Sequence, residues 1–442
     1  MHGPSQALSL GLSVAGIALA LLRRRIQQEG DEYWLSTWPK LVRFPIFWVG
    51  LAVVVYCVIQ AINPSWRYQQ NGKVWWLVPI REIRWLPTGI DAPFAEFNAW
   101  RQVIIYADAW LLVCSIWVGV TRRRSLRILL GVLMGNAALL WVLLDYQRLT
   151  GNERIPWPLT DWTRQALTAS FIYSNHAGAF FALVAFTAVA LATWHFDHGA
   201  RLLLKSTPAG VFALATLFLV AAVIFTFSRG ATLTVGLALA IFAVWFVLRL
   251  RLRPTPDRRS LAGMAVVLVV FLVFILNAVR YLDFSHVNER FDRMATQQLN
   301  DANLRSRMLA HEAAAGMLGD HWLRGVGAGG FRYLFPGYVR RYPEIYKNGG
   351  LFWEHAHCDW LEIPIELGLW GDLLLLGGAG WWAWFFSRHG ALWHPAAMPL
   401  LFGCLQTVVH AAFDFPFQCP AILGTWCAMV TMAGKWVEID GG

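Results

Sequence analysis

The sequence predicts an all-α polytopic membrane protein with about eleven or twelve transmembrane helices and one large loop that contains short helices. Three features indicate this fold class: 57% of the 442 residues are hydrophobic, only 14% are charged, and the mean hydropathy is +0.46. Soluble domains usually carry about 25% charged residues. In addition, apolar runs of about 17 to 20 residues recur, each long enough to cross a hydrocarbon core of about 30 Å as a helix.

The apolar runs are predicted to be helices because lipid cannot satisfy the polar groups of an irregular backbone. They are Ala7–Leu22, Phe44–Ile62, Val103–Val120, Ile128–Leu144, Ala177–Trp194, Val211–Phe227, Ala231–Leu248, Leu261–Val279, Leu367–Phe386, Ala396–Phe413 and Phe417–Ala433. The last two meet at a tight corner at Asp414-Phe415-Pro416. The first run has its positive charge after it, so it is expected to be a retained anchor. Residues 1–442 are expected to form a single membrane domain.

Arginine clusters at alternate connections predict the orientation, since short loops rich in Lys and Arg remain in the cytoplasm. The clusters are Arg23–Arg25, Arg122–Arg127 and Arg249–Arg259, and the long segments on the opposite side are Asn63–Gln102, Asp145–His176 and Arg280–Glu366. Much of the net charge of +10 therefore encodes orientation. No nucleic-acid motif accompanies it, so we expect no nucleic-acid partner.

The segment Arg280–Glu366 is too long for a simple connector and too polar to cross the membrane, so it is expected to carry function. Asp301 to Asn303 can cap a helix over Leu304–Leu318, which ends at Gly319. A glycine-rich stretch, Gly325–Gly330, follows; it lacks the Gly-Lys-Ser/Thr ending of a nucleotide-binding loop and is interpreted as a turn.

Three arginines are candidates for binding a phosphate group, because a guanidinium matches phosphate oxygens in a bidentate way. Arg229 stands between two predicted spans, and Arg305 and Arg307 lie near the start of the loop helix. His311 is four residues after Arg307 and shares its helix face. The alternatives are an interfacial anchor for Arg229 and solvated surface charges for the other two.

The cluster Glu354–Asp359 allows three interpretations: metal ligands, a general base, or polar residues at the membrane interface. His355, His357, Cys358 and Asp359 are all capable ligands, but two His one residue apart with no second cluster predict no metal site. A His base oriented by Asp359 or Glu366 is favoured. No cofactor is expected.

Two further observations leave alternatives open. The ionisable residues Asp108, His410 and Asp414 lie within or near spans, which is compatible with a transporter pathway. Exposed loop aromatics can stack on sugar rings, and the candidates are Trp75, Trp76, Trp353 and Trp360. Five of the six cysteines fall in or beside apolar runs, so no disulfide framework is predicted.

Residues 175–416 resemble the O-antigen ligase and polymerase superfamily. The strings YSNHAGAFFAL and FSRGATL, the latter with Arg229, match in order, and SRMLAHEAAAGMLGDHWLRGVGAGGF carries Arg307 in the family's arginine position. His357, Gly368 and Gly371 reproduce a His-(Asn/Ser/Gln)-x9-Gly-x-x-Gly pattern within HCDWLEIPIELGLWG. Cys358 departs from it, where ligases carry a small amide or hydroxyl.

The resemblance implies a metal-independent, inverting glycosyltransferase of the bacterial inner membrane, with its active site and the loop 280–366 facing the periplasm. The donor would be a glycan on undecaprenyl diphosphate, and the acceptor lipid A-core, another glycan or a protein. His357 would be catalytic, and Arg229, Arg307 and Arg305 would bind the diphosphate. His355, Asp359, Glu366 and His311 would support the acceptor. Alternatives are a polymerase, a protein O-oligosaccharyltransferase and a polysaccharide transporter.

Overall fold

The structure is a computed structural model that describes residues 3–22, 24–28, 31–35, 37–94, 96–151, 168–202, 206–252, 302–346 and 352–441. The predicted span Leu261–Val279 and the beginning of the large loop lie outside these residues. The chain divides into two compact units. Unit 1 is Met1–Thr121 with Gln298–Phe385, and unit 2 is Arg122–Gln297 with Phe386–Gly442.

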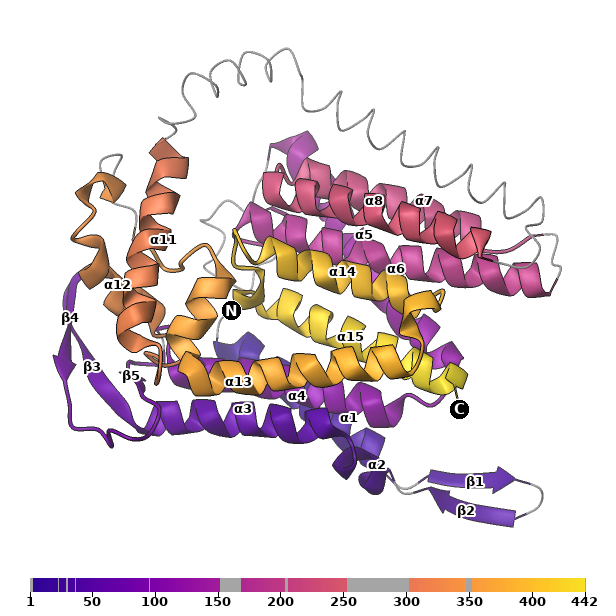
Figure 1. Ribbon diagram of the computed structural model, residues 1–442, viewed down its shortest axis with the longest axis horizontal. Helices are drawn as coiled ribbons and strands as arrows, with labels where there is room; N and C mark the ends of the chain where they lie inside the picture. The colour runs from indigo at the N-terminus through magenta and orange to yellow at the C-terminus, as the bar shows by residue number, and fades with distance from the viewer. Residues whose placement is uncertain are drawn as a thin grey trace, which may run out of the picture. The chain divides into compact units, whose positions relative to one another are not determined.

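The prediction of an all-α polytopic membrane protein is confirmed (Figure 1). Among the described residues, six helices are long and apolar enough to cross a membrane: α3 (Pro45–Ile62), α4 (Ala99–Gly119), α5 (Arg123–Thr150), α6 (Ser174–Arg201), α8 (Arg229–Arg251) and α13 (Asp359–Arg388). The shorter apolar helices α1 (Gly3–Leu21), α7 (Ala209–Phe225) and α14 (Ala397–His410) occupy three further predicted spans, and α15 (Pro420–Gly441) covers most of the last.

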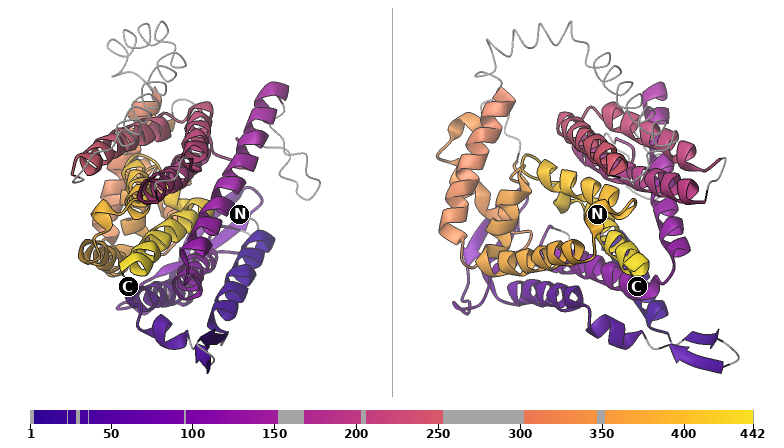
Figure 2. Two further views of the ribbon diagram at one scale, coloured as in Figure 1. Left: turned by 90° about the vertical axis from the view of Figure 1, so that its right-hand side faces the viewer. Right: turned by 45° about the vertical axis from the view of Figure 1, so that its right-hand side comes forward.

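In unit 2, α6 packs against each of the helices α5, α7, α8, α14 and α15. Figure 2 shows the ribbon in two further views. In its most apolar stretch, 94% of the residues are buried, against 17% in the corresponding stretch of α5. Helix α14 approaches α6 so closely that a Cβ on Gly403 would lie 2.7 Å from Cβ of Phe186. Small residues permit such close backbone packing in membranes.

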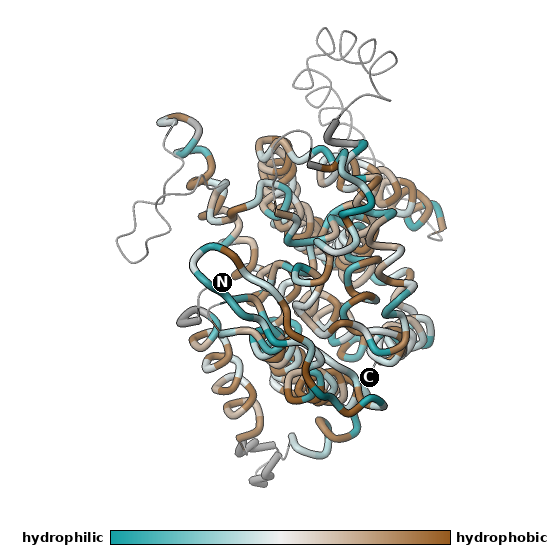
Figure 3. The backbone as a smooth tube through the Cα atoms, turned by 90° about the vertical axis from the view of Figure 1, so that its left-hand side faces the viewer, coloured by the Kyte–Doolittle hydropathy of each residue, from teal (hydrophilic) through white to brown (hydrophobic). Residues whose placement is uncertain are grey.

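Large hydrophobic side chains remain exposed on the outer helices. On α5, Leu139 is 72% exposed and Val142 is 62% exposed, and Figure 3 shows the hydrophobic colouring along much of the helical tube. A surface this apolar would cause the protein to aggregate in water, whereas lipid tails solvate it without a free-energy cost. The exposed apolar faces are therefore the lipid-facing ones.

In unit 1, α1 packs against α4 around a carboxylate. Asp108 on α4 accepts hydrogen bonds from the hydroxyl groups of Ser9 and Ser13 on α1. Helix α3 also packs on α4, where Gly50 leaves room for the indole of Trp110. The hydroxyls satisfy a charged group that would otherwise be costly inside an apolar bundle.

Two small sheets were not predicted: an antiparallel hairpin and a mixed sheet. Strands β1 (Arg24–Gln28) and β2 (Asp31–Leu35) form the hairpin, and the mixed sheet has the order β4-β3-β5, from β3 (Pro64–Asn71), β4 (Val74–Pro79) and β5 (Gly89–Asp91). In it, β3 pairs antiparallel with β4 and parallel with β5. The β3–β4 turn contains Gly72 at φ 61°. An Asn-Gly pair before alternating apolar residues is a hairpin signal, and the sequence carries it at Asn71-Gly72.

The remaining elements are the helix of the large loop, which is long, and several short helices. The helix predicted over Leu304–Leu318 lies within α11 (Ala302–His321), whereas its predicted cap Asp301 is outside the described residues. The short helices are α2 (Trp38–Val42), α12 (Phe331–Val339), and the 3-10 turns η2 (Pro343–Tyr346), η3 (Ala391–Trp393) and η4 (Pro416–Gln418). The tight corner predicted at Asp414 to Pro416 joins α14 to α15.

Helix α13 is broken inside its apolar length. It begins at Asp359, eight residues before the predicted span start at Leu367, and Gly368 has φ 66° and ψ −178°. Its backbone therefore leaves the helix for one residue. The break frees the carbonyl oxygens that precede it, and these must find other donors.

The freed carbonyls are satisfied by the glycine-rich stretch and by α3. Val326 N donates to Ile365 O at 2.9 Å and Gly327 N donates to Glu366 O at 3.0 Å. From α3, Gln60 Nε2 also donates to Glu366 O at 3.0 Å and Tyr56 donates to Leu367 O. The glycine-rich stretch Gly325–Gly330 therefore uses its backbone N–H groups to bond the carbonyl groups of α13, not to bind a phosphate.

Gly368→Ala is expected to destabilise unit 1. A Cβ there would lie 2.4 Å from Gly325 N, and φ 66° is unfavourable for alanine, so the cost is at least about 1–3 kcal/mol. Thermal unfolding of the purified protein measures it. The control is Gly377→Ala on the same helix, where a Cβ meets nothing within 4 Å and a gain of up to about 1 kcal/mol is expected. Equal effects of the two variants would contradict the role of the break.

Candidate active site

Helix α11 presents a small-residue face to the rest of unit 1. Ala310, Ala313 and Ala314 follow the i, i+3, i+4 spacing of one helix face and are buried in a core with Phe331, Phe335 and Ala356. Alanines on this face allow α12 and the segment around Ala356 to approach α11 closely. The predicted site residues of α11 and of the Glu354–Asp359 cluster are thereby brought into one region.

The cluster forms a tight turn before α13. His357 has φ 53°, a left-handed conformation that non-glycine residues adopt only where the surroundings impose it. Glu362, one turn into α13 and 1% exposed, imposes it with both carboxylate oxygens. Its Oε1 lies 2.6 Å from His355 Nδ1, and its Oε2 accepts from Ala356 N at 2.7 Å.

The ring of His357 is held from a second side. Trp353 meets it edge to face, with ring centroids 5.2 Å apart and an interplanar angle of 80°. The ring of Phe97, which precedes α4, meets His355 in the same manner at 6.2 Å. Both imidazoles therefore lie against aromatic surface, which limits their rotation while the backbone turn sets their direction.

His311 lies directly beside this turn. Its side chain bonds to the backbone of His357 and Ala356, while burial, aided by the charge of Arg307, lowers its pKa below the usual value. His311 is therefore neutral at neutral pH. Arg307 and His311 both lie within α11, four residues apart, so they share a helix face, and the charge of Arg307 acts on the imidazole.

The other predicted residues of this unit have different neighbours. Arg305 forms an ion pair with Glu344 at 2.8 Å, with the two side chains 57% and 41% exposed. Asp359 is buried at the start of α13. Glu366 is also buried, and its Oε1 accepts from Phe331 N at 3.2 Å, so it holds the start of α12. Glu362, which was not among the predicted site residues, contacts His355.

Cys358, the departure from the ligase pattern, is buried directly after His357. Burial raises the pKa of its thiol above the usual value. A protonated, buried thiol is a poor nucleophile and a poor metal ligand. Among the residues that the structure describes, no three His, Cys, Asp or Glu side chains are grouped so as to hold a metal ion.

Aromatic side chains of the β3–β4 hairpin pack on α12. The ring of Tyr333 lies 5.6 Å from that of Tyr68 and 5.9 Å from that of Trp75, and Phe352 is also 5.9 Å from Trp75. Trp75, a candidate sugar platform, thus has one side occupied by this packing. Trp76 and Trp360 are the more open candidates, at 42% and 59% exposed.

Arg229 belongs to unit 2, where it is the first residue of α8. Ser228 caps the helix by accepting from Ala231 N at 3.3 Å, and Phe227 before it has φ 56°. The guanidinium is exposed. An exposed arginine at a helix N-terminus can bind an anion together with the free N–H groups of the first turn.

A buried His–Asp pair supports the Arg229 turn. A Cβ on Gly230 would lie 2.8 Å from His410 Nε2, so α8 rests directly on that imidazole. His410 Nε2 is 3.6 Å from Asp414 Oδ2. Burial alone would raise the pKa of Asp414, but bonding to His410 and to Phe415 N outweighs it and lowers the pKa. The two residues are therefore paired to each other beneath Arg229.

The chain was compared with known proteins. Residues 212–376 match the family model described as O-antigen ligase. The matched region contains Arg229, Arg307 and His357, together with the α13 break. No curated protein matches the chain.

Glu362→Ala is expected to destabilise the protein by about 1–3 kcal/mol, because it leaves the buried Ala356 N–H without an acceptor. Glu362→Gln, which keeps one oxygen for this N–H, should lose less. Thermal unfolding measures both. The control is Glu344→Ala, whose exposed ion pair contributes at most about 1 kcal/mol. If Glu362→Ala behaves like Glu344→Ala, the carboxylate does not hold the turn.

Proposed function

Because residues 212–376 match the O-antigen ligase family model, we propose that the chain transfers a glycan from undecaprenyl diphosphate to an acceptor hydroxyl, with lipid A-core as the favoured acceptor. The observation that carries the proposal is the left-handed turn of His357, which Glu362 holds and which His311 of α11 contacts. A turn that costs energy and is fixed from several sides is typical of a functional position.

In the proposed reaction, His357 takes the proton of the acceptor hydroxyl. The hydroxyl oxygen attacks the anomeric carbon from the face opposite the diphosphate, a new C–O bond forms, and the bond to the diphosphate oxygen breaks with its electron pair. The anomeric configuration inverts in this single displacement. General base catalysis of this kind contributes about 10²–10⁴-fold.

Arg307 and Arg229 are proposed to compensate the charge that develops on the departing diphosphate. Fixed guanidinium groups stabilise such charge strongly because they need not reorganise during the reaction. With its charge compensated, a diphosphate leaves without a metal ion. The assignment of Arg229 to the same diphosphate rests on the sequence resemblance, and the exposed position of Arg229 at the start of α8 suits it.

The remaining candidates have supporting roles in this proposal. His311, neutral beside the turn, and His355, bonded to Glu362, keep the acceptor side of the site in place, and buried Asp359 and Glu366 fix the ends of the segment. For Arg305 to bind diphosphate it must release Glu344, which costs at most about 1 kcal/mol for an exposed pair.

The proposed location is the bacterial inner membrane, with the site facing the periplasm. The arginine-rich connections support it, since they carry the cytoplasmic signal and Arg229 starts α8 at the end opposite Arg249 and Arg251. A polyprenyl donor remains in the membrane, so a site beside helix ends receives its diphosphate at the depth of the headgroups.

His357→Ala and Arg307→Ala are each expected to reduce transfer by about 100-fold or more. The assay uses purified protein, a polyprenyl-diphosphate glycan and lipid A-core in the presence of EDTA, and measures linked product. Arg340→Ala, an exposed arginine at the end of α12, should retain activity within about two-fold. Product formation by both site variants at normal abundance would refute their roles, and loss of product in EDTA would refute metal independence.

The same assay separates the alternative activities. A polymerase lengthens the donor glycan without lipid A-core, and a protein O-oligosaccharyltransferase modifies a peptide instead. A transporter moves the glycan across a vesicle membrane and forms no new bond. Each of these results would replace the ligase assignment.

A further inference from the structure

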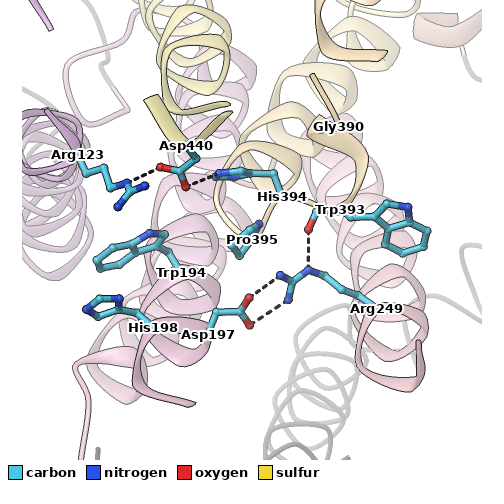
Figure 4. Close-up of a pocket in the computed structure, with 10 residues that line it drawn as sticks. All are labelled: Arg123, Trp194, Asp197, His198, Arg249, Gly390, Trp393, His394, Pro395 and Asp440. Carbon is cyan, nitrogen blue, oxygen red and sulfur yellow. Dashed lines mark hydrogen bonds and ion pairs between the residues drawn. The ribbon is translucent and has the colours of Figure 1, made fainter. Parts of the chain in front are cut away.

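Unit 2 contains a cavity of about 360 Å³ at one end of its helices (Figure 4). Its walls come from the first residue of α5, the last turns of α6, α8 and α15, and the segment that precedes α14. The volume falls within the range of small-molecule sites, which is about 300–1,000 Å³. None of its lining residues takes part in the proposed transfer reaction.

The cavity lies at the membrane face opposite Arg229. Arg229 is the first residue of α8 and Arg249, which lines the cavity, is twenty residues further along the same helix. At 1.5 Å per residue the separation is about 30 Å, the thickness of the hydrocarbon core. Trp194 and Trp393 also line the cavity, as expected for the interface, where indole rings favour headgroup depth.

One wall of the cavity contains a buried ion pair between Arg249 and Asp197. Both Nη nitrogens of Arg249 bond to the carboxylate of Asp197, with Nη1 to Oδ1 at 3.0 Å, and its Nε donates to Trp393 O at 2.9 Å. The two side chains are only 10% and 3% exposed. A pair buried and satisfied to this degree holds the helices together and costs several kcal/mol to open.

The opposite wall carries a second ion pair, between Arg123 and Asp440, whose groups are accessible from the cavity. Arg123 uses its Nε to contact Asp440 Oδ1, and within the described chain this carboxylate is its only hydrogen-bond partner, so both Nη nitrogens remain for a ligand. Figure 4 shows its guanidinium at the cavity wall. Arg123 and Asp440 are 52% and 26% exposed. A cation and an anion are therefore presented side by side.

His394 fixes the charge of Asp440. Its Nδ1 accepts from Ala396 N at 3.2 Å and Ala397 N at 3.0 Å, so its proton is on Nε2, which lies 2.9 Å from Asp440 Oδ2. Burial by itself would raise the pKa of Asp440, but the bonds from His394 and Arg123 outweigh it and lower the pKa. The carboxylate is therefore ionised at neutral pH.

We propose that this cavity binds the phosphoethanolamine group of a membrane phospholipid. Its phosphate oxygens bond to the free Nη nitrogens of Arg123, and its ammonium group donates to the carboxylate of Asp440. The cavity favours a group with both charges, because a purely anionic headgroup would face Asp440 and Asp197 without a cation of its own. A choline headgroup has no N–H to donate, so it forfeits the bond to Asp440.

The bound lipid would join the ends of α5, α6, α8 and α15. It would thereby add a contact among helices whose outer faces are already lipid-exposed, without touching the residues assigned to transfer. We expect it to raise the thermal stability of unit 2 while leaving the chemistry at Arg229 and His357 unchanged.

The test uses the full-length protein, delipidated in detergent and then offered phosphatidylethanolamine, phosphatidylcholine or phosphatidylglycerol with identical acyl chains. Native mass spectrometry counts bound lipid, and thermal unfolding reports stabilisation. We expect at least about five-fold higher retention of phosphatidylethanolamine than of either other lipid, which corresponds to about 1 kcal/mol. Equal retention of phosphatidylcholine, or preferential retention of phosphatidylglycerol, would overturn the proposal.

Variants locate the binding site. Arg123→Ala and Asp440→Asn should abolish the preference, and Arg124→Ala, an exposed arginine on the same helix that does not line the cavity, should keep it. A preference that survives both site variants would overturn the assignment. Monodisperse gel filtration of each variant shows that it remains folded.

Soluble phosphoethanolamine separates the two sources of this chemical group. Displacement of the lipid only at concentrations about 100-fold above those of the lipid supports a lipid ligand, since the acyl chains then supply the missing affinity. Binding of the soluble group as tightly as the lipid would overturn the lipid assignment in favour of a cytoplasmic metabolite.

Discussion

The broken hydrogen-bond ladder of α13 is the constraint on which unit 1 depends. An apolar helix that interrupts itself at Gly368 exposes carbonyl groups where lipid offers no donor, and each unsatisfied group costs several kcal/mol. The glycine-rich stretch from the large loop and the polar side chains of α3 supply the donors. Segments far apart in the sequence are therefore held together at the backbone of α13, by backbone donors of the glycine-rich stretch and side-chain donors of α3.

The same helix also builds the turn that carries His357. The residues on either side of the turn are fixed by α13, since Glu362 holds the turn through Ala356 N and Glu366 holds the start of α12 through Phe331 N. The break and the turn lie within eleven residues of each other, from His357 to Gly368. The helix that is discontinuous at Gly368 thus also fixes the position of the His357 turn.

Local patterns predicted the spans that fall within the described residues, the helix within the large loop and the corner at Asp414, because each follows from hydropathy, capping or turn residues in sequence. The sequence did not predict which carboxylate contacts which histidine. Asp359 and Glu366 were the carboxylates expected to orient a histidine, whereas the structure places Glu362, one turn into α13, against His355. The β3–β4 hairpin had a local signal at Asn71-Gly72, but a search for apolar runs passes over half-exposed strands.

Helix α4 depends on α1 for the hydrogen bonds to its carboxylate. Asp108 receives its hydrogen bonds from Ser9 and Ser13 of α1, which lie about a hundred residues before it in the chain. Without α1, the carboxylate of Asp108 on α4 would face hydrocarbon without hydrogen-bond donors, which is costly. A chain cut between α1 and α4 would incur the same cost. The two serines of α1 therefore supply the polar partners that the carboxylate of α4 needs inside an apolar bundle.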